Sequence, residues 1–249
     1  MKGNYLILVC IITTAIVSGC LSNLEETGDT RVPEPSPTMI FTDIGSENEI
    51  EIPWVALPDD FREETEIREY QNITLTPIFR QGNNAIKETQ HIDVNTYKLQ
   101  IDGLVDRPGF FTYNQLIAYP PTSKVVSLNC VEGWSFTAKW TGVQLETLLN
   151  VTGIKDNATE VIFYSSDGYS TSHDLTYLLD NNIFLAYKLN DVTLPDERGF
   201  PLQLVAEDKF GYKWVKWIIW IELTDKPFEG YWESRGYSNN AVVGGPAFE

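Results

Sequence analysis

Cys130 is the residue of this chain whose type most directly suggests chemistry. The sequence contains three cysteines, and the other two, Cys10 and Cys20, lie near the N-terminus in a segment that has the form of an export signal. The domain that would remain after export therefore has one thiol and no second cysteine for an internal disulfide. Such a thiol is either a small buried apolar side chain or a ligand.

The other residues exclude several common kinds of catalytic site. His91 and His173 are the only histidines, and the sequence has no H-E-x-x-H pattern, no C-x-x-C pair and no C-x-x-C-H haem attachment motif. It also lacks the G-x-S-x-G pattern of serine hydrolases and a glycine-rich phosphate loop. A redox metal held mainly by an organic cofactor, with few protein ligands, is compatible with this composition.

The segments on either side of Cys130 predict the elements that position it. Residues 124–128 indicate a buried strand, so that Cys130 follows its carboxyl end. Residues 97–102 alternate between apolar and polar side chains, as a half-buried strand does. Further strands are expected at residues 160–165, 183–189, 201–206 and 214–223.

Short helices are expected between these strands. Two sequences of the capping-box form, Thr112–Gln115 and Thr141–Gln144, each predict a helix start, and Gly153 is a plausible end for the second helix. Asp167-Gly168 has the composition of a hairpin turn. Because strands and short helices mix irregularly, the order favours an α+β fold of mixed sheets in a single domain.

The N-terminal part of the chain predicts export and anchoring. Residues 1–19 have the form of a lipoprotein signal peptide, and the lipobox-like sequence that ends at Cys20 predicts that this cysteine carries a lipid; an ordinary signal peptide or a membrane anchor is the alternative. Residues 20–55 are expected to form an acidic, proline-containing tether, residues 56–236 the folded domain and residues 237–249 a C-terminal tail. The protein is therefore expected outside the cytoplasm, on the outer face of the cytoplasmic membrane.

Charge and aromatic content limit the class of partner. The net charge of −17 argues against binding to nucleic acid. The seven Trp, 12 Tyr and 12 Phe residues suit one large packed domain, and we expect most of the tryptophans to lie in its core rather than to relay electrons.

Five stretches, in this order and spacing, resemble the molybdopterin-binding oxidoreductase domain of the sulfite oxidase family. The resemblance extends from about Leu75 to Tyr237, roughly two-thirds of the chain. These stretches are Tyr97–Pro108, Cys130–Ser135, Trp140–Leu145, Asp167–Tyr169 and Gly211–Trp217. The resemblance implies a sulfite-oxidase-type fold, molybdenum with molybdopterin as the cofactor, and Cys130 as the protein's ligand to the metal. A soft thiolate suits that role beside the sulfur atoms of the pterin.

The same resemblance implies further contacts with the cofactor. Main-chain contacts are expected at Trp214 and Val215, and a cation near the phosphate at Lys213 and Lys216. The full set of expected cofactor-binding residues is Arg80, Asn83, Asn84, Cys130, Ser165, Arg198, Lys213, Trp214, Val215 and Lys216. The alternative for the two lysines is that they lie at a strand edge, where their charge only keeps the protein soluble. The alternative for residues 80–84 is a polar turn.

Tyr169 and His173 are expected beside the pocket, where either could supply a proton during catalysis together with Cys130. The alternative is that Asp167-Gly168 is only a structural turn and that His173 is an exposed residue.

Two departures from the family pattern bear on the substrate. Many relatives carry an arginine where this chain has Gln203, which leaves one contact with the cofactor in doubt. Sulfite oxidases place arginines soon after the metal-binding cysteine, whereas this chain has Val131, Glu132, Gly133 and Trp134 there. A carboxylate would repel sulfite, so the pattern is closer to the exported methionine-sulfoxide reductase branch.

Together these features predict a lipid-anchored, molybdenum-dependent oxidoreductase. We expect oxygen-atom transfer or two-electron redox on a small molecule such as an S-oxide, and a separate electron-transfer protein, either a membrane haem protein or a quinone-linked subunit. The n-region has Lys2 but no twin-arginine pair, so the export route is open. The alternative hypothesis is a non-catalytic lipoprotein that uses the same fold to bind a ligand.

Overall fold

A computed structural model describes residues 64–248 of the chain. The signal segment, the predicted lipidation site at Cys20, the whole acidic tether (20–55) and the first residues of the predicted domain (56–63) lie outside the described residues. In the described part no helix is both long enough and apolar enough to cross a membrane.

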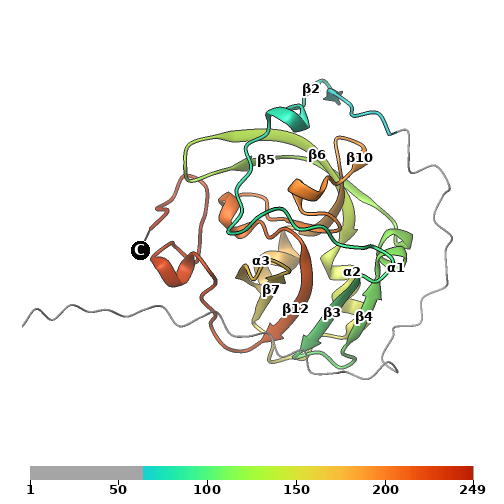
Figure 1. Cartoon of the computed structure of the whole chain (residues 1–249). Helices are drawn as coiled ribbons and strands as arrows, with labels where there is room; N and C mark the ends of the chain where they lie inside the picture. The colour runs from blue at the N-terminus through green and yellow to red at the C-terminus, as the bar shows by residue number, and fades with distance from the viewer. Residues whose placement is uncertain (1–63, 249) are drawn as a thin grey trace, which may run out of the picture. The chain divides into compact units, whose positions relative to one another are not determined.

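Two five-stranded sheets form the framework of the domain (Figure 1). The first sheet has the order β4-β3-β12-β7-β8, in which β12 pairs with β3 in parallel and the other pairs are antiparallel. Its strands are β3 (Lys98–Gly103), β4 (Gly109–Thr112), β7 (Glu160–Ser165), β8 (Ser170–Asp174) and β12 (Ile218–Thr224).

The second sheet has the order β10-β9-β6-β5, with β11 also paired to β9, and all of its pairs are antiparallel. Its strands are β5 (Thr122–Asn129), β6 (Ser135–Gln144), β9 (Phe184–Leu189), β10 (Val192–Thr193) and β11 (Gln203–Val205). A small hairpin, β1 (Glu69–Tyr70) with β2 (Ile73–Thr74), precedes both sheets in the described chain.

Helices in the described residues are short, as the sequence predicts. The α-helices are α1 (Tyr113–Ala118), α2 (Leu145–Thr152) and α3 (Leu175–Asp180), and the 3₁₀ turns are η1 (Ile78–Arg80), η2 (Asp196–Arg198), η3 (Gly211–Lys213) and η4 (Glu233–Arg235). The capping box at Thr112 is formed in both directions with Gln115, and Gly153 ends α2 with a φ of 75°. These two local predictions are confirmed.

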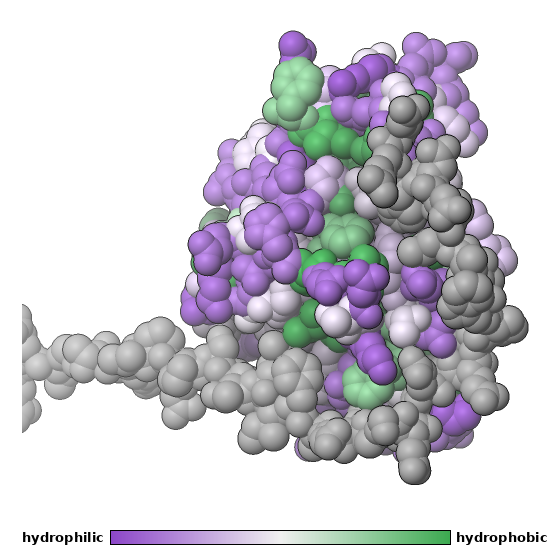
Figure 2. All heavy atoms as spheres, turned by 45° about the vertical axis from the view of Figure 1, so that its right-hand side comes forward, coloured by the Kyte–Doolittle hydropathy of each residue, from purple (hydrophilic) through white to green (hydrophobic). Residues whose placement is uncertain are grey.

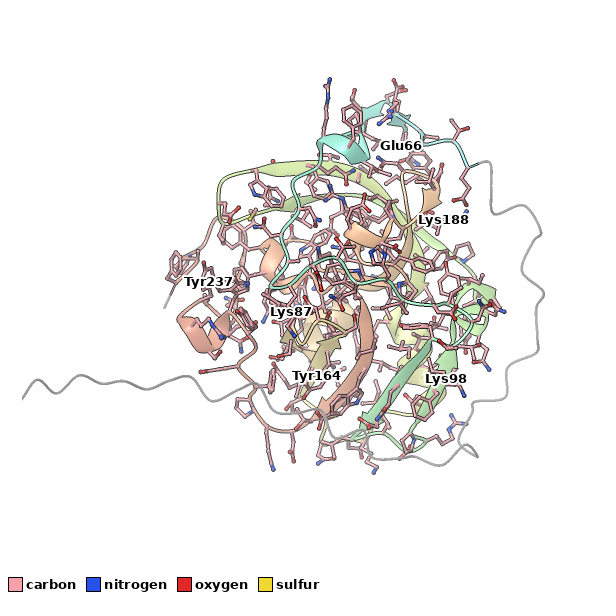
Figure 3. All side chains as sticks on the ribbon, viewed as in Figure 1. Glu66, Lys87, Lys98, Tyr164, Lys188 and Tyr237 are labelled. Carbon is pink, nitrogen blue, oxygen red and sulfur yellow. The ribbon has the colours of Figure 1, made fainter. Side chains whose placement is uncertain are left out.

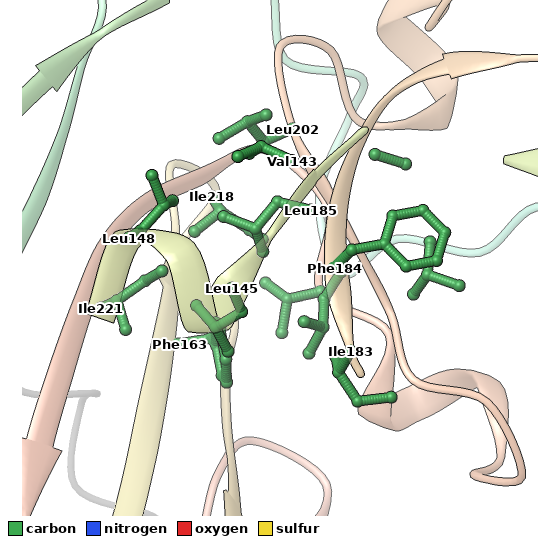
Figure 4. Close-up of a cluster of buried hydrophobic side chains, with 14 of the residues drawn as sticks. Val143, Leu145, Leu148, Phe163, Ile183, Phe184, Leu185, Leu202, Ile218 and Ile221 are labelled. Atoms are coloured by element: carbon green, nitrogen blue, oxygen red, sulfur yellow. The ribbon is translucent and has the colours of Figure 1, made fainter. Parts of the chain in front are cut away.

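The two sheets and α2 share one apolar core (Figure 4). Phe163 and Ile221 come from the first sheet, Val143 and Leu185 from the second, and Leu148 from α2, and all five side chains are buried. Burying one such side chain stabilises the fold by roughly 1.5–3 kcal/mol. Hydrophilic residues cover most of the described surface in Figure 2, with hydrophobic ones showing in patches between them.

Two local predictions are wrong. The sequence Thr141–Gln144 forms no capping box, because β6 continues through Gln144 and pairs with β9. The strand expected at 214–223 begins only at Ile218, because η3 and a bend precede it, and Trp217 there has a positive φ of 50°. Pairing between distant segments has overridden the local pattern in both places.

Residues 237–248, expected as a tail, fold back onto the domain. Ala241 is fully buried and its carbonyl accepts a hydrogen bond from the Phe210 amide at 2.8 Å. In Figure 1 this last segment, coloured red, runs beside the rest of the domain towards the end marked C. The segment is therefore part of the packed structure.

Candidate active site

A pocket of about 970 Å³, counted with its part open to solvent, lies where the ends of both sheets meet the loops. The turn between β5 and β6 forms one wall and the segment from η3 to Trp217 another. The polar or reactive residues that line it include Asn83, Asn84, Cys130, Glu132, Ser165, Asp167, Tyr169, Arg198, Gln203 and Lys216. Its size is that of a site for a cofactor or a small ligand.

Cys130 follows the last residue of β5 and enters a tight turn. Its amide donates to the Trp134 carbonyl at 2.9 Å, and the Gly133 amide donates back to the Cys130 carbonyl at 3.1 Å. Gly133 has a φ of 90°, which a residue with a side chain rarely adopts, so glycine permits this turn. The two strands thus present the thiol to the pocket, as the prediction of a strand ending before Cys130 requires.

The thiol is half-buried and has an amide close to it. The Asn84 Nδ2 atom lies 3.9 Å from the Cys130 Sγ atom. Burial raises the pKa of the Cys130 thiol; the charge of Glu132 adds to the rise, whereas the backbone amides of Glu132 and Val131 oppose it. The free thiol is therefore protonated near neutral pH, and a bound metal ion would itself provide the charge that removes the proton.

Arg198 holds the loop that carries Asn83 and Asn84. Its guanidinium donates to the carbonyls of Gly82 at 2.6 Å, Gln81 at 2.5 Å and Ile78 at 3.2 Å. The side chain is buried and lies over the Phe136 ring. These contacts use three of the five guanidinium N–H groups, both of those on one terminal nitrogen included, and the buried Nε atom of Arg198 has no partner.

Lys216 is the cation of the pocket wall. Its Nζ atom donates to Asn83 Oδ1 at 2.8 Å and to the Glu197 carbonyl at 3.2 Å. Burial, reinforced by the nearby Arg198, lowers the pKa of Lys216 to about 8. A bound anion would stabilise the charged form, so this lysine is suited to hold a phosphate.

Several buried polar atoms at the pocket have no hydrogen-bond partner. Ser165 Oγ, Gln203 Oε1 and Arg198 Nε are all in this state, and all three residues line the pocket. An unsatisfied buried polar atom costs about 1–3 kcal/mol, so native proteins rarely leave three together. Donors and acceptors in this arrangement suit a polar ring system that offers both kinds of group.

Most of the predicted site residues lie together in this pocket. Asn83, Asn84, Cys130, Ser165, Tyr169, Arg198, Trp214 and Lys216 all line it. Tyr169 is half-buried, its hydroxyl donates to the Tyr212 carbonyl, and desolvation raises the pKa of its phenol well above the usual range. Its proton is therefore held by the backbone rather than aimed freely at the pocket.

Four predicted residues lie elsewhere. Lys213 is fully buried in an ion pair with Glu233 at 2.7 Å, so its charge is not offered to a phosphate. Val215 is buried behind the wall and its carbonyl accepts from the Leu204 amide. Arg80 is exposed, with its guanidinium over the Phe79 ring.

His173 is also outside this pocket and is not the exposed residue of the alternative interpretation. It is buried in β8, where its Nε2 atom donates to the Lys213 carbonyl at 2.9 Å. It lines a separate polar pocket with Glu160, Ser172 and Lys209. Burial lowers the pKa of His173 well below the usual range, so the ring is neutral.

Two aromatic residues of the pocket wall, Trp232 and Tyr237, are absent from the predicted set. The sequence signal that could have indicated them is the density of aromatic residues from Tyr231 onward, which is unusual for a solvated tail.

A family described as "Oxidoreductase molybdopterin binding domain" matches residues 86–232, more than half of the chain. The chain belongs to this family. This confirms the resemblance to sulfite-oxidase-type domains and the expected cofactor, molybdenum with molybdopterin.

Similar proteins of known sequence agree with this assignment. The chain is 36% identical over 151 residues to the "Putative protein-methionine-sulfoxide reductase subunit YedZ1" of Azospira oryzae, covering 61% of this chain and 58% of that relative. It is 32% identical over 169 residues to the "Uncharacterized oxidoreductase YuiH" of Bacillus subtilis, covering 67% of this chain and 83% of the relative.

A solved structure shows the same fold. The sulfane dehydrogenase SoxCD from Paracoccus pantotrophus matches with a TM-score of 0.61 at 23% identity, covering 74% of this chain and 52% of that chain. This likeness confirms the α+β, sulfite-oxidase-type fold.

The residues of the pocket fit the cofactor of the family. Cys130 offers a half-buried sulfur, Lys216 offers a cation for the phosphate, and the unpartnered atoms of Ser165, Gln203 and Arg198 offer polar contacts for the pterin. The contact expected from an arginine at position 203 is replaced by an amide, whose Oε1 atom accepts a hydrogen bond but carries no charge.

Proposed function

We propose that this molybdopterin-dependent oxidoreductase reduces small neutral S-oxides at a molybdenum centre bound by Cys130. The observation that carries the proposal is a half-buried thiol at a pocket whose buried polar atoms lack partners. When bound, the cofactor supplies an oxygen-atom acceptor that is re-reduced by two electrons. A sulfoxide then takes up two electrons and two protons and leaves as a thioether and water.

The charges of the pocket support a neutral substrate. Glu132 lies two residues after Cys130, where its carboxylate accepts from the Trp134 indole at 2.9 Å. The guanidinium of Arg198 is occupied by loop carbonyls, so it has no fork to offer an oxyanion such as sulfite. A neutral S=O group avoids repulsion by the carboxylate, which agrees with the name of the Azospira oryzae relative.

Proton supply falls to the polar residues of the wall rather than to His173. Lys216 is not the proton donor in this proposal, because the phosphate that it holds stabilises its charged form. Asp167 lies on the same wall, and its carboxylate accepts from the Tyr169 amide at 2.9 Å.

The electrons come, in this proposal, from a separate protein at the membrane, either a haem protein or a quinone-linked subunit. The proposed lipid at Cys20 holds the domain on the outer face of the cytoplasmic membrane, and residues 20–55 tether it there. The tether keeps the domain close to a membrane-bound donor, which raises the effective concentration of the partner.

The test compares wild type with Cys130→Ser, both matured in a host that makes the cofactor. We expect equimolar molybdenum and turnover of sulfoxides with an artificial electron carrier in wild type, and loss of both in the variant, because a serine oxygen is a poorer ligand for this metal. Val243→Ala, on the exposed part of the chain, is the matched control. Equal molybdenum in wild type and Cys130→Ser would contradict the metal-binding role. Turnover that survives the substitution would place the chemistry at a different site, and a wild type without turnover would leave the alternative, a protein that only binds a ligand.

A further inference from the structure

The C-terminal strap, residues 237–248, lies beyond the residues 86–232 that match the family, yet it borders the pocket. It runs along the segment 208–213. The Tyr212 hydroxyl donates to the Ser238 carbonyl at 2.7 Å, and the Lys209 Nζ atom donates to the Asn240 carbonyl at 2.6 Å. The Val243 amide donates to the Asp208 carbonyl at 2.9 Å. The strap is therefore fixed by hydrogen bonds along most of its length.

A buried ion pair fixes the beginning of the strap. Lys213 donates to Glu233 at 2.7 Å and to Asn239 Oδ1 at 2.8 Å, and Thr171 of β8 donates to the same Glu233 oxygen. Both charged side chains are 1% exposed. Since an ion pair at this depth has little freedom, residues 233–239 are held in one position relative to η3 and β8.

The strap contributes an aromatic ring to the wall of the pocket. The Tyr237 ring meets Tyr212 edge to face, with 5.2 Å between ring centroids, and lies 5.1 Å from Trp232. All three residues line the pocket, and Tyr237 is half-buried. Phe248, at the other end of the strap, packs on the outer side of Tyr237 at 4.6 Å. Figure 3 shows Tyr237 at the edge of the domain that carries the C-terminal segment.

We propose that Tyr237 is a specificity-determining residue, which sets the width of the pocket opening and gives the flanking groups of the substrate an aromatic surface. This inference rests on the proposed reduction of S-oxides. Aromatic faces attract sulfur and alkyl groups but offer little to an anion. The ring therefore favours compact, apolar S-oxides and hinders the entry of bulky ones.

The accessibility of Cys130 to thiol reagents tests the role of Tyr237 without any turnover. The cofactor-free full-length protein is treated with iodoacetamide or with a pyrene-bearing maleimide, and modification of Cys130 is followed by peptide mass spectrometry, which separates it from Cys10 and Cys20. For Tyr237→Ala we expect a several-fold faster reaction with the bulky reagent and an unchanged rate with iodoacetamide. Tyr237→Phe, which keeps the ring, and Val243→Ala, which alters the strap away from the pocket, are expected to behave as wild type.

Turnover gives the second readout. We expect Tyr237→Ala to raise kcat/KM several-fold for methyl phenyl sulfoxide relative to dimethyl sulfoxide, with equal molybdenum content. Unchanged reagent rates in Tyr237→Ala would overturn the inference, as would a rise with both reagents, which shows that the strap has only a structural role. If wild type reduces neither sulfoxide while the bulky reagent still discriminates, the proposed function fails and the role of Tyr237 in access stands.

Discussion

Arg198 and Lys216 both line the pocket, but the two cations have different contacts. The guanidinium of Arg198 donates hydrogen bonds to three backbone carbonyls, so Arg198 is a positioning residue for the loop with Asn83 and Asn84. Lys216 keeps its charge at the wall, beside Asn83 Oδ1. The resemblance to the family predicted both residues at the cofactor. In the structure Arg198 positions a loop, whereas the charge of Lys216 lies at the pocket wall beside Asn83.

Binding of the phosphate-bearing cofactor is expected to weaken as pH rises through about 8, because burial and Arg198 lower the pKa of Lys216 to about that value. Above it the lysine is neutral and loses its attraction for the anion. In the cofactor-free protein the free energy of unfolding changes with pH in the opposite direction. Below about pH 8 the buried charge of Lys216 destabilises the folded state, and this destabilisation decreases as pH rises towards 10.5, the pKa of the unfolded chain.

The measurement is cofactor retained after dialysis at several pH values. Lys216→Met is expected to retain little at any pH and to lose the dependence near pH 8, whereas exposed Lys226→Met serves as the control and should keep it. A wild-type profile that is flat between pH 7 and pH 9 would contradict the role given to Lys216.

At the scale of elements, contacts between distant segments decided what the sequence could predict. The strands β5, β7, β9 and the capping box at Thr112 follow local patterns and were predicted close to their observed bounds. The end of β6 was missed because its pairing with β9 overrides the capping-box sequence. For residues 80–84 the sequence left a cofactor contact and a polar turn both open, because the conformation of this loop depends on Arg198, 116 residues beyond Gly82.

Gly82→Ala is expected to disturb the wall of the pocket. An added Cβ atom would lie 2.5 Å from the Trp134 ring, which must then move away and weaken its hydrogen bond with Glu132. Such overpacking typically costs about 1–3 kcal/mol. Denaturant unfolding with tryptophan fluorescence measures the loss, and molybdenum content should fall with it. Gly245→Ala, where the nearest atom is at 3.1 Å, is the control, and equal stability of the two variants would refute the close contact.

At the scale of the whole molecule, the pocket includes a residue, Tyr237, from the segment that the sequence assigned to a tail. The sequence pattern identified the cofactor, and most of the predicted site residues, Cys130 included, line the pocket. It assigned residues 237–249 to a tail and Lys213 to the phosphate, because neither the burial of Lys213 nor its partner Glu233 can be inferred from local sequence. The burial of the Lys213 charge depends on residues that are distant in the sequence, so only the folded structure reveals it.

The Lys213–Glu233 pair should therefore couple the stability of the domain to the shape of the pocket. Glu233→Gln leaves a fully buried ammonium without its counter-charge, and breaking a buried pair in this way typically costs about 3–5 kcal/mol. The double variant Lys213→Met with Glu233→Met removes both charges and is expected to recover much of that loss, because apolar groups of similar volume need no partner. Chemical denaturation of wild type, Lys213→Met, Glu233→Met and the double variant, the four proteins of the cycle, gives the coupling energy. In Glu233→Gln the bulky maleimide should also reach Cys130 faster, since the beginning of the strap is released. Additive losses in the cycle, with unchanged access to Cys130, would mean that the pair neither fixes the strap nor shapes the pocket.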